Sequence, residues 1–282
     1  MAGLASRAGR AAPLGVAGTL ALVALTAVAW EGAPTLAGIA WIAFFGMAGG
    51  ALLGGRARAD HPLGLVWGYG LASGAMVASA SAFLLPSATG HDPRLGGFGV
   101  AAGLLVGFGG HAVGHRLTHF PLPMDRTVAA LTAHAVAAGA IIGAVYTTMP
   151  ALGPLLGLAI VSHKGPAGYA AARRLARAGR SPLPLLAPAS GLGVTALAVS
   201  LLSPARNPAL QAVVFGFAAG VFLHVAMDFL PSCEAGDEIY EMAGDGAGGV
   251  AHAVLDRLRL HAVVSTGLGG LAVFAAWLAV SG

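Results

Sequence analysis

Polar residues at five positions lie inside long apolar stretches of this sequence, where a charged side chain is expensive. They are His134, the adjacent pair His163 and Lys164, and the pair His224 and Asp228. An ammonium group at the centre of a membrane-spanning helix costs about 2.5–3.5 kcal/mol, so such groups persist where they line a protein interior or a watery path. These residues therefore predict that something polar binds within, or moves through, a membrane-embedded protein.

His224 and Asp228 are four residues apart, so on a helix their side chains share one face. A neutral imidazole and a carboxylate can hold one divalent cation together, or the carboxylate can orient an imidazole that holds it. The other interpretation is a hydrogen-bonded pair that only joins two helices. His134 admits the same two interpretations, metal binding or a hydrogen bond to a backbone carbonyl.

His163 and Lys164 are followed by Gly165, Pro166 and Gly168. A proline inside a helix removes a backbone hydrogen bond. At membrane depth this is tolerated only where neighbouring groups or a cavity satisfy the freed carbonyl. We therefore predict a helix break at Pro166, with the opened backbone beside His163 and Lys164.

A second histidine series, His111, His115 and His119, repeats every fourth residue near the end of another apolar stretch. On a helix these side chains form one stripe, which can bind a transition metal loosely. Histidines at a membrane interface also occur for solvation alone, and both interpretations stay open.

The elements that must position these residues are membrane helices. Apolar residues make up 57% of the 282 residues and charged residues only 9%, with a mean hydropathy of +0.80. Soluble domains carry about 25% charged residues, and the 44 glycines suit close helix packing in a bilayer. The fold class is therefore all-α, a polytopic membrane helix bundle.

Composition and motifs also exclude several classes of protein. The single cysteine, Cys233, excludes a disulfide within the chain and a cysteine-based zinc knuckle. No phosphate-binding loop, nucleophile elbow or HExxH motif occurs, so we expect no enzyme. The basic residues are scattered between apolar runs, which indicates membrane topology rather than nucleic-acid binding.

Apolar runs long enough to cross a bilayer predict about nine spans. They cover residues 14–30, 35–53, 63–86, 95–115, 127–148, 152–172, 183–203, 208–231 and 260–280. With the N-terminus in the cytoplasm, twelve arginines fall on the cytoplasmic side and only Arg94 and Arg206 fall outside. This bias follows the positive-inside rule and predicts a cell-membrane protein whose C-terminus lies outside.

The first of these runs has an alternative interpretation. Residues 1–34 are either a cytoplasmic segment with an extra span or a signal peptide cleaved after Ala27-Val28-Ala29. Residues 35–282 then form the main transmembrane domain. Similar segments end the third and eighth runs in opposite directions across the membrane, as inverted repeats of transporters require.

Residues 219–231, AGVFLHVAMDFLP, and residues 83–86, FLLP, are similar to two spans of the ZIP (Zrt/Irt-like) family of divalent metal transporters. Asp228 matches the carboxylate of that family's penultimate span. His134 and Gly139 match its first metal-binding span, and His163 and Pro166 match the next one. The resemblance implies an eight-span core from about residue 35, preceded by an added N-terminal helix.

The same resemblance places Ala135, Ala138 and Ala167 where the family has polar or acidic residues. It therefore implies at most one metal ion, bound by His134 and His163 with Asp228 or His224 as a further ligand. In this interpretation the Lys164 ammonium takes the place of a second cation. Nitrogen-rich coordination suits Zn, Cu, Fe or Ni better than Mg or Ca.

The leading hypothesis is a carrier that moves a divalent transition metal ion, zinc first, by alternating access. Its partners are the lipid bilayer and the ion, with no tightly bound cofactor, and the glycine-rich faces would permit a homodimer. Because of the three alanines, a second hypothesis is a non-transporting sensor, regulator or subunit. A remote third hypothesis is a redox protein that binds haem b between His134 and His224.

Overall fold

A computed structural model describes residues 2–57, 62–117, 125–148, 153–202, 207–229 and 249–281, and every regular element in these ranges is a helix. In chain order they are α1 (Ala2–Ala29), α2 (Pro34–Arg56), α3 (Pro62–Ser79), η1 (Ala80–Leu84), α4 (Leu85–His91), α5 (Pro93–Leu117), α6 (Arg126–Thr148), α7 (Gly153–Arg177), η3 (Leu183–Leu185), α8 (Leu186–Leu201), α9 (Pro208–Phe229) and α11 (Gly249–Ser281).

Seven of the described helical segments are long and apolar enough to cross a membrane, which confirms a polytopic helical bundle. They are Ala12–Ala29, Pro34–Arg56, Val66–His91, Thr127–Thr147, Leu183–Leu201, Pro208–Met227 and Asp256–Ala279. The two other predicted spans fall on the 25-residue helices α5 and α7. The helices therefore lie where the apolar runs predict them, while the count of nine crossings stays a prediction.

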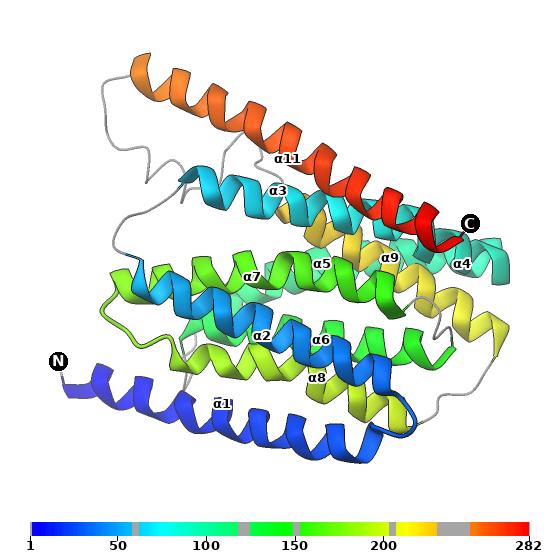
Figure 1. Cartoon of the computed structure of the whole chain (residues 1–282), viewed down its shortest axis with the longest axis horizontal. Coiled ribbons are helices and arrows are strands. Elements are labelled where there is room, and N and C mark those ends of the chain that lie inside the picture. Colours follow the sequence, from blue (N-terminus) through cyan, green and yellow to red (C-terminus); the bar gives the residue numbers. More distant parts are fainter. Residues whose placement is uncertain are drawn as a thin grey trace.

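The helices run roughly side by side, and the two ends of the chain lie at opposite ends of the bundle (Figure 1). They pack into two groups. The first group is α1, α2, α6, α7 and α8, in which α2 packs on α7 and α6 packs on α8; the second group is α3, α4, α5, α9 and α11, in which α5 packs on α9 and α3 packs on α11. Between the groups, most contacts are those of α3 with α7.

Glycines hold the helix pairs together because they let two backbones meet directly. Gly50 of α2 lies against Gly165 of α7, and one turn later Gly54 lies against Tyr169. The other pairs have the same kind of crossing, such as Gly103 of α5 against Gly220 of α9. A methyl group at these points would meet backbone atoms of the neighbouring helix, so the packing fixes each helix tightly against its partner.

The segment from α3 to α4 is one continuous helix with a wide turn, η1, just before Pro86. The Leu85 amide donates to the carbonyl of Ala80, five residues earlier, which is the pattern of a π-helix. The proline ring would otherwise press on the carbonyl four residues before it. The wide turn therefore lets the helix accommodate Pro86, and the Ser87 hydroxyl bonds the Phe83 carbonyl at 2.7 Å.

The predicted break at Pro166 is wrong, because α7 continues through it from Gly153 to Arg177. The proline removes one backbone hydrogen bond, but neighbouring helices clamp this part of α7. Gly50 of α2 contacts Gly165 on one side, and Gly68 of α3 lies against the Pro166 ring on the other. Tertiary packing thus keeps the helix continuous where the local sequence predicts an interruption.

Candidate functional site

Helix α6 presents His134 on the same face as Ala138 and Ile141. These residues are four and three positions apart, so their side chains lie above one another on a helix. All three line one cavity inside the bundle. Ala135, on the neighbouring face, is fully buried against the core instead.

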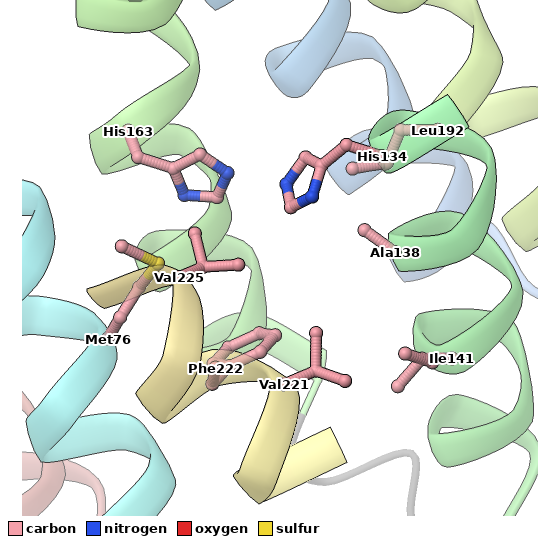
Figure 2. A pocket seen from close by; sticks show the side chains of 9 residues that line it. All are labelled: Met76, His134, Ala138, Ile141, His163, Leu192, Val221, Phe222 and Val225. Carbon is pink, nitrogen blue, oxygen red and sulfur yellow. The ribbon is translucent and has the colours of Figure 1, made fainter. Parts of the chain in front are cut away.

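Helix α7 brings His163 to the same cavity, where its side chain is 5% exposed. The centroids of the His134 and His163 rings are 6.3 Å apart, and the ring planes meet at 71°. Figure 2 shows a nitrogen atom of each ring on the side that faces the other ring. Two residues that the sequence places 29 positions apart therefore form one pair of facing imidazoles.

The cavity that both rings line is small and lies where the two helix groups meet. The first group contributes residues from α6, α7 and α8, and the second group contributes residues from α3 and α9; the lining consists of Met76, His134, Ala138, Ile141, His163, Leu192, Val221, Phe222 and Val225 (Figure 2). About 20 Å³ is open to the centre of a water-sized sphere. That is room for about one water molecule or one metal ion.

Lys164 lies beside His163 in α7 and is only 3% exposed. It does not line the cavity, but it directly follows His163, which does. Among the carboxylates that the structure describes, none forms an ion pair with Lys164. A buried ammonium therefore sets a positive charge next to the pair of histidines.

The structure does not bring His224 to this cavity. Val221, Phe222 and Val225 form the face of α9 that lines it, whereas the His224 ring lies against Gly107 of α5. In the described structure His224 therefore does not lie with His134 and His163, which argues against His224 as a ligand and against a haem between His134 and His224. Asp228 as the further ligand stays a prediction.

The remaining candidate residues belong to helices whose side chains are only partly described. Asp228 lies in the last turn of α9, three residues after Val225, and its side chain is outside the described part. His111 and His115 lie in the last turns of α5, and their side chains are also outside it. His119 falls in the undescribed residues 118–124.

The ring separation limits the kinds of coordination that the site can offer. With metal–nitrogen distances of about 2.0 Å, two imidazoles at a tetrahedral angle have centroids ~5 Å apart, and two imidazoles in line across one ion have centroids ~6.4 Å apart. The 6.3 Å separation is close to the second arrangement, and it is also an ordinary spacing for two rings packed edge to face. Among the described side chains, no three His, Cys, Asp or Glu residues converge on one point.

A haem has a similar in-line arrangement of two imidazoles, but its macrocycle must fit between them. The open space of about 20 Å³ holds about one water-sized group. Phe222, Val225 and Leu192 occupy the walls around it. The geometry therefore favours a small ion and not a macrocycle.

Met76 of α3 is a cavity residue that sequence reasoning missed. It is 1% exposed and supplies the one sulfur atom among the residues that line the cavity. Methionine in an apolar helix is normally read as a flexible core residue. Only the packing of the helices reveals that this side chain lines the same cavity as two imidazoles.

No protein-family model matches the chain, and no curated protein sequence matches it. The similarity to the ZIP family thus rests on the quoted motif residues. Of these, His134 and His163 lie together at the cavity, and Pro166 contacts the second helix group through Gly68.

Proposed function

We propose that the chain carries a transition metal ion across a membrane, with one ion bound between His134 and His163. The observation that carries this proposal is the pair of facing imidazoles in a cavity at the meeting of two helix groups. Imidazole nitrogen suits zinc, copper, iron and nickel. The resemblance to ZIP transporters implies zinc first.

The position of the cavity supports transport rather than storage. Both histidines belong to the first helix group, while Met76 and the apolar residues of α9 close the cavity from the second group. In alternating access, one group of helices rocks against the other around a site at their interface. Glycine crossings within each group and looser contact between the groups are suited to such a movement.

Lys164 supports a single-ion site. A second cation close to a buried ammonium would be repelled in a region of low dielectric. The described side chains offer no carboxylate at the cavity to offset that repulsion. We therefore propose that one ion is bound at a time and that Lys164 supplies a fixed positive charge.

The test is uptake of Zn²⁺ into vesicles that contain the purified full chain, with an intravesicular zinc-sensitive dye. His134→Ala and His163→Ala should each slow uptake by about tenfold or more, because each removes one of two imidazole ligands. His224→Ala is the matched control, since this histidine lies in the bundle but against Gly107. Equal uptake by all four proteins would contradict the site.

A second candidate function is a membrane protein that binds metal without moving it. Ala138 favours this candidate because it lines the cavity where the resemblance implies a carboxylate ligand. Binding of metal that depends on both histidines, in vesicles that show no uptake, would support the second candidate over the first.

A further inference from the structure

We propose that the ion held at this site is monovalent copper, Cu(I), with the Met76 thioether as its third ligand beside His134 and His163. The proposal rests on the proposed function and names its ion. Three neutral ligands, two imidazoles and one thioether, would then surround a single monovalent cation.

The first observation is the position of Met76. Its side chain is 1% exposed and enters the cavity from α3, and Figure 2 places its sulfur-bearing side chain on the same side as His163. Thioether sulfur is a soft ligand that selects Cu(I), whereas Mg, Ca and Mn prefer oxygen. A leucine would fill this apolar position equally well without offering a ligand.

The second observation is the separation of the two rings. At 6.3 Å the centroids fit imidazoles that face each other across one ion, with a spacing of ~6.4 Å, better than the ~5 Å of tetrahedral zinc. Cu(I) accepts two ligands in line with a third from the side, and Met76 approaches from a different helix. Zinc would need the rings to move closer and a further ligand.

The third observation is charge. Lys164 places a buried ammonium beside the site, and no described carboxylate lines the cavity. A buried charge is costly unless it is paired, and a monovalent ion adds one positive charge fewer than a divalent ion. If Asp228 supplied a carboxylate, it would offset one positive charge whether Cu(I) or Zn²⁺ were bound. The site with Cu(I) would still carry one positive charge fewer than the site with Zn²⁺.

The test measures binding by the purified full chain with three probes: Cu(I) under anaerobic reducing conditions, Ag(I) as a redox-inert substitute, and Zn²⁺. The dissociation constants come from competition with chromophoric chelators. We expect Cu(I) and Ag(I) to bind more tightly than Zn²⁺. Met76→Leu should weaken Cu(I) and Ag(I) by about tenfold or more and leave Zn²⁺ within about twofold, because it removes a ligand at nearly constant volume.

Met47→Leu is the matched control, since Met47 of α2 is also 1% exposed but does not line the cavity. It should leave all three dissociation constants unchanged. X-ray absorption of the Cu(I)-loaded protein should show a sulfur neighbour that is lost in Met76→Leu, which keeps the test independent of any loss of stability.

Two outcomes separate this proposal from the one before it. Zinc binding and uptake that need both histidines, with Ag(I) binding equal in Met76→Leu and Met47→Leu, would overturn the copper assignment and leave the carrier proposal standing. Failure of His134→Ala and His163→Ala to weaken any of the three ions would overturn both.

Discussion

The crossing of α2 and α7 gives the sharpest test of how helix packing positions the histidines. In Gly50→Ala, the added methyl would lie 3.0 Å from the carbonyl carbon and 3.1 Å from the Cα of Gly165, and closer still to its oxygen. Carbon atoms in good contact are about 3.5–4.0 Å apart, so α7 must move away from α2 by roughly 1 Å. His163 is two residues from this contact and must move with it.

The expected magnitude follows from the size of the clash. Overpacking of this kind costs about 1–3 kcal/mol, while replacement of glycine by alanine inside a helix gains up to about 1 kcal/mol. Gly49→Ala is the matched control, because Gly49 precedes Gly50 in the same helix and has no atom within 4 Å of an added methyl. Gly50→Ala should therefore be less stable than Gly49→Ala by about 2 kcal/mol.

The assay is denaturant unfolding of both variants in the same detergent, followed by metal binding at a temperature where both are folded. Gly50→Ala should also bind metal more weakly, because a shift of about 1 Å changes the 6.3 Å separation of the rings. Equal stability of the two variants, within about 0.5 kcal/mol, would refute the close approach of these backbones at Gly165.

Three further predictions concern the cavity and its support. Metal binding should weaken on acidification, because protons compete with the ion for the His134 and His163 nitrogens. A dissociation constant that does not change with pH would contradict two-histidine ligation. Ala138→Asp should tighten Zn²⁺ binding about tenfold or more, because it adds a carboxylate to the cavity wall. The neutral variant Ala138→Asn should not tighten binding. Equal effects of the two substitutions would argue against an ion at this point. Ser73→Ala should lower the free energy of unfolding by about 1 kcal/mol. The reason is that the buried Ser73 hydroxyl donates a 2.8 Å hydrogen bond to the Ala226 carbonyl and so joins α3 to α9. An unchanged free energy of unfolding would show that this bond adds nothing.

The positions of the helices could be predicted from the sequence because the length of an apolar run sets the length of a span. The rotation of each helix could not. Apart from Gln211, His224 and Asp228, α9 is apolar on all sides, so its sequence gives little indication of which face meets the interior. Its rotation is set by glycines such as Gly216 and Gly220, which lock it to α5, and this turns His224 towards Gly107 instead of the cavity.

The candidate site was predictable in part for a related reason. His134 and His163 stand out as polar groups in apolar runs, and both lie at the cavity. Met76 gave no such signal because its side chain is apolar. Pro166 led to a wrong prediction. Its local chemistry predicts a helix break, whereas contacts from Gly50 and Gly68 keep α7 helical.

The pairing of α3 with α11 also has a consequence for how the protein is made. Gly70 and Gly74 of α3 lie against Ser265 and Thr266 of α11, almost two hundred residues later in the chain. During synthesis, α3 therefore enters the membrane long before the helix that covers its glycine face. Until α11 emerges from the ribosome, that face is open to lipid or to an insertion chaperone, so a nascent chain stalled before residue 249 should be a preferred target of membrane quality control.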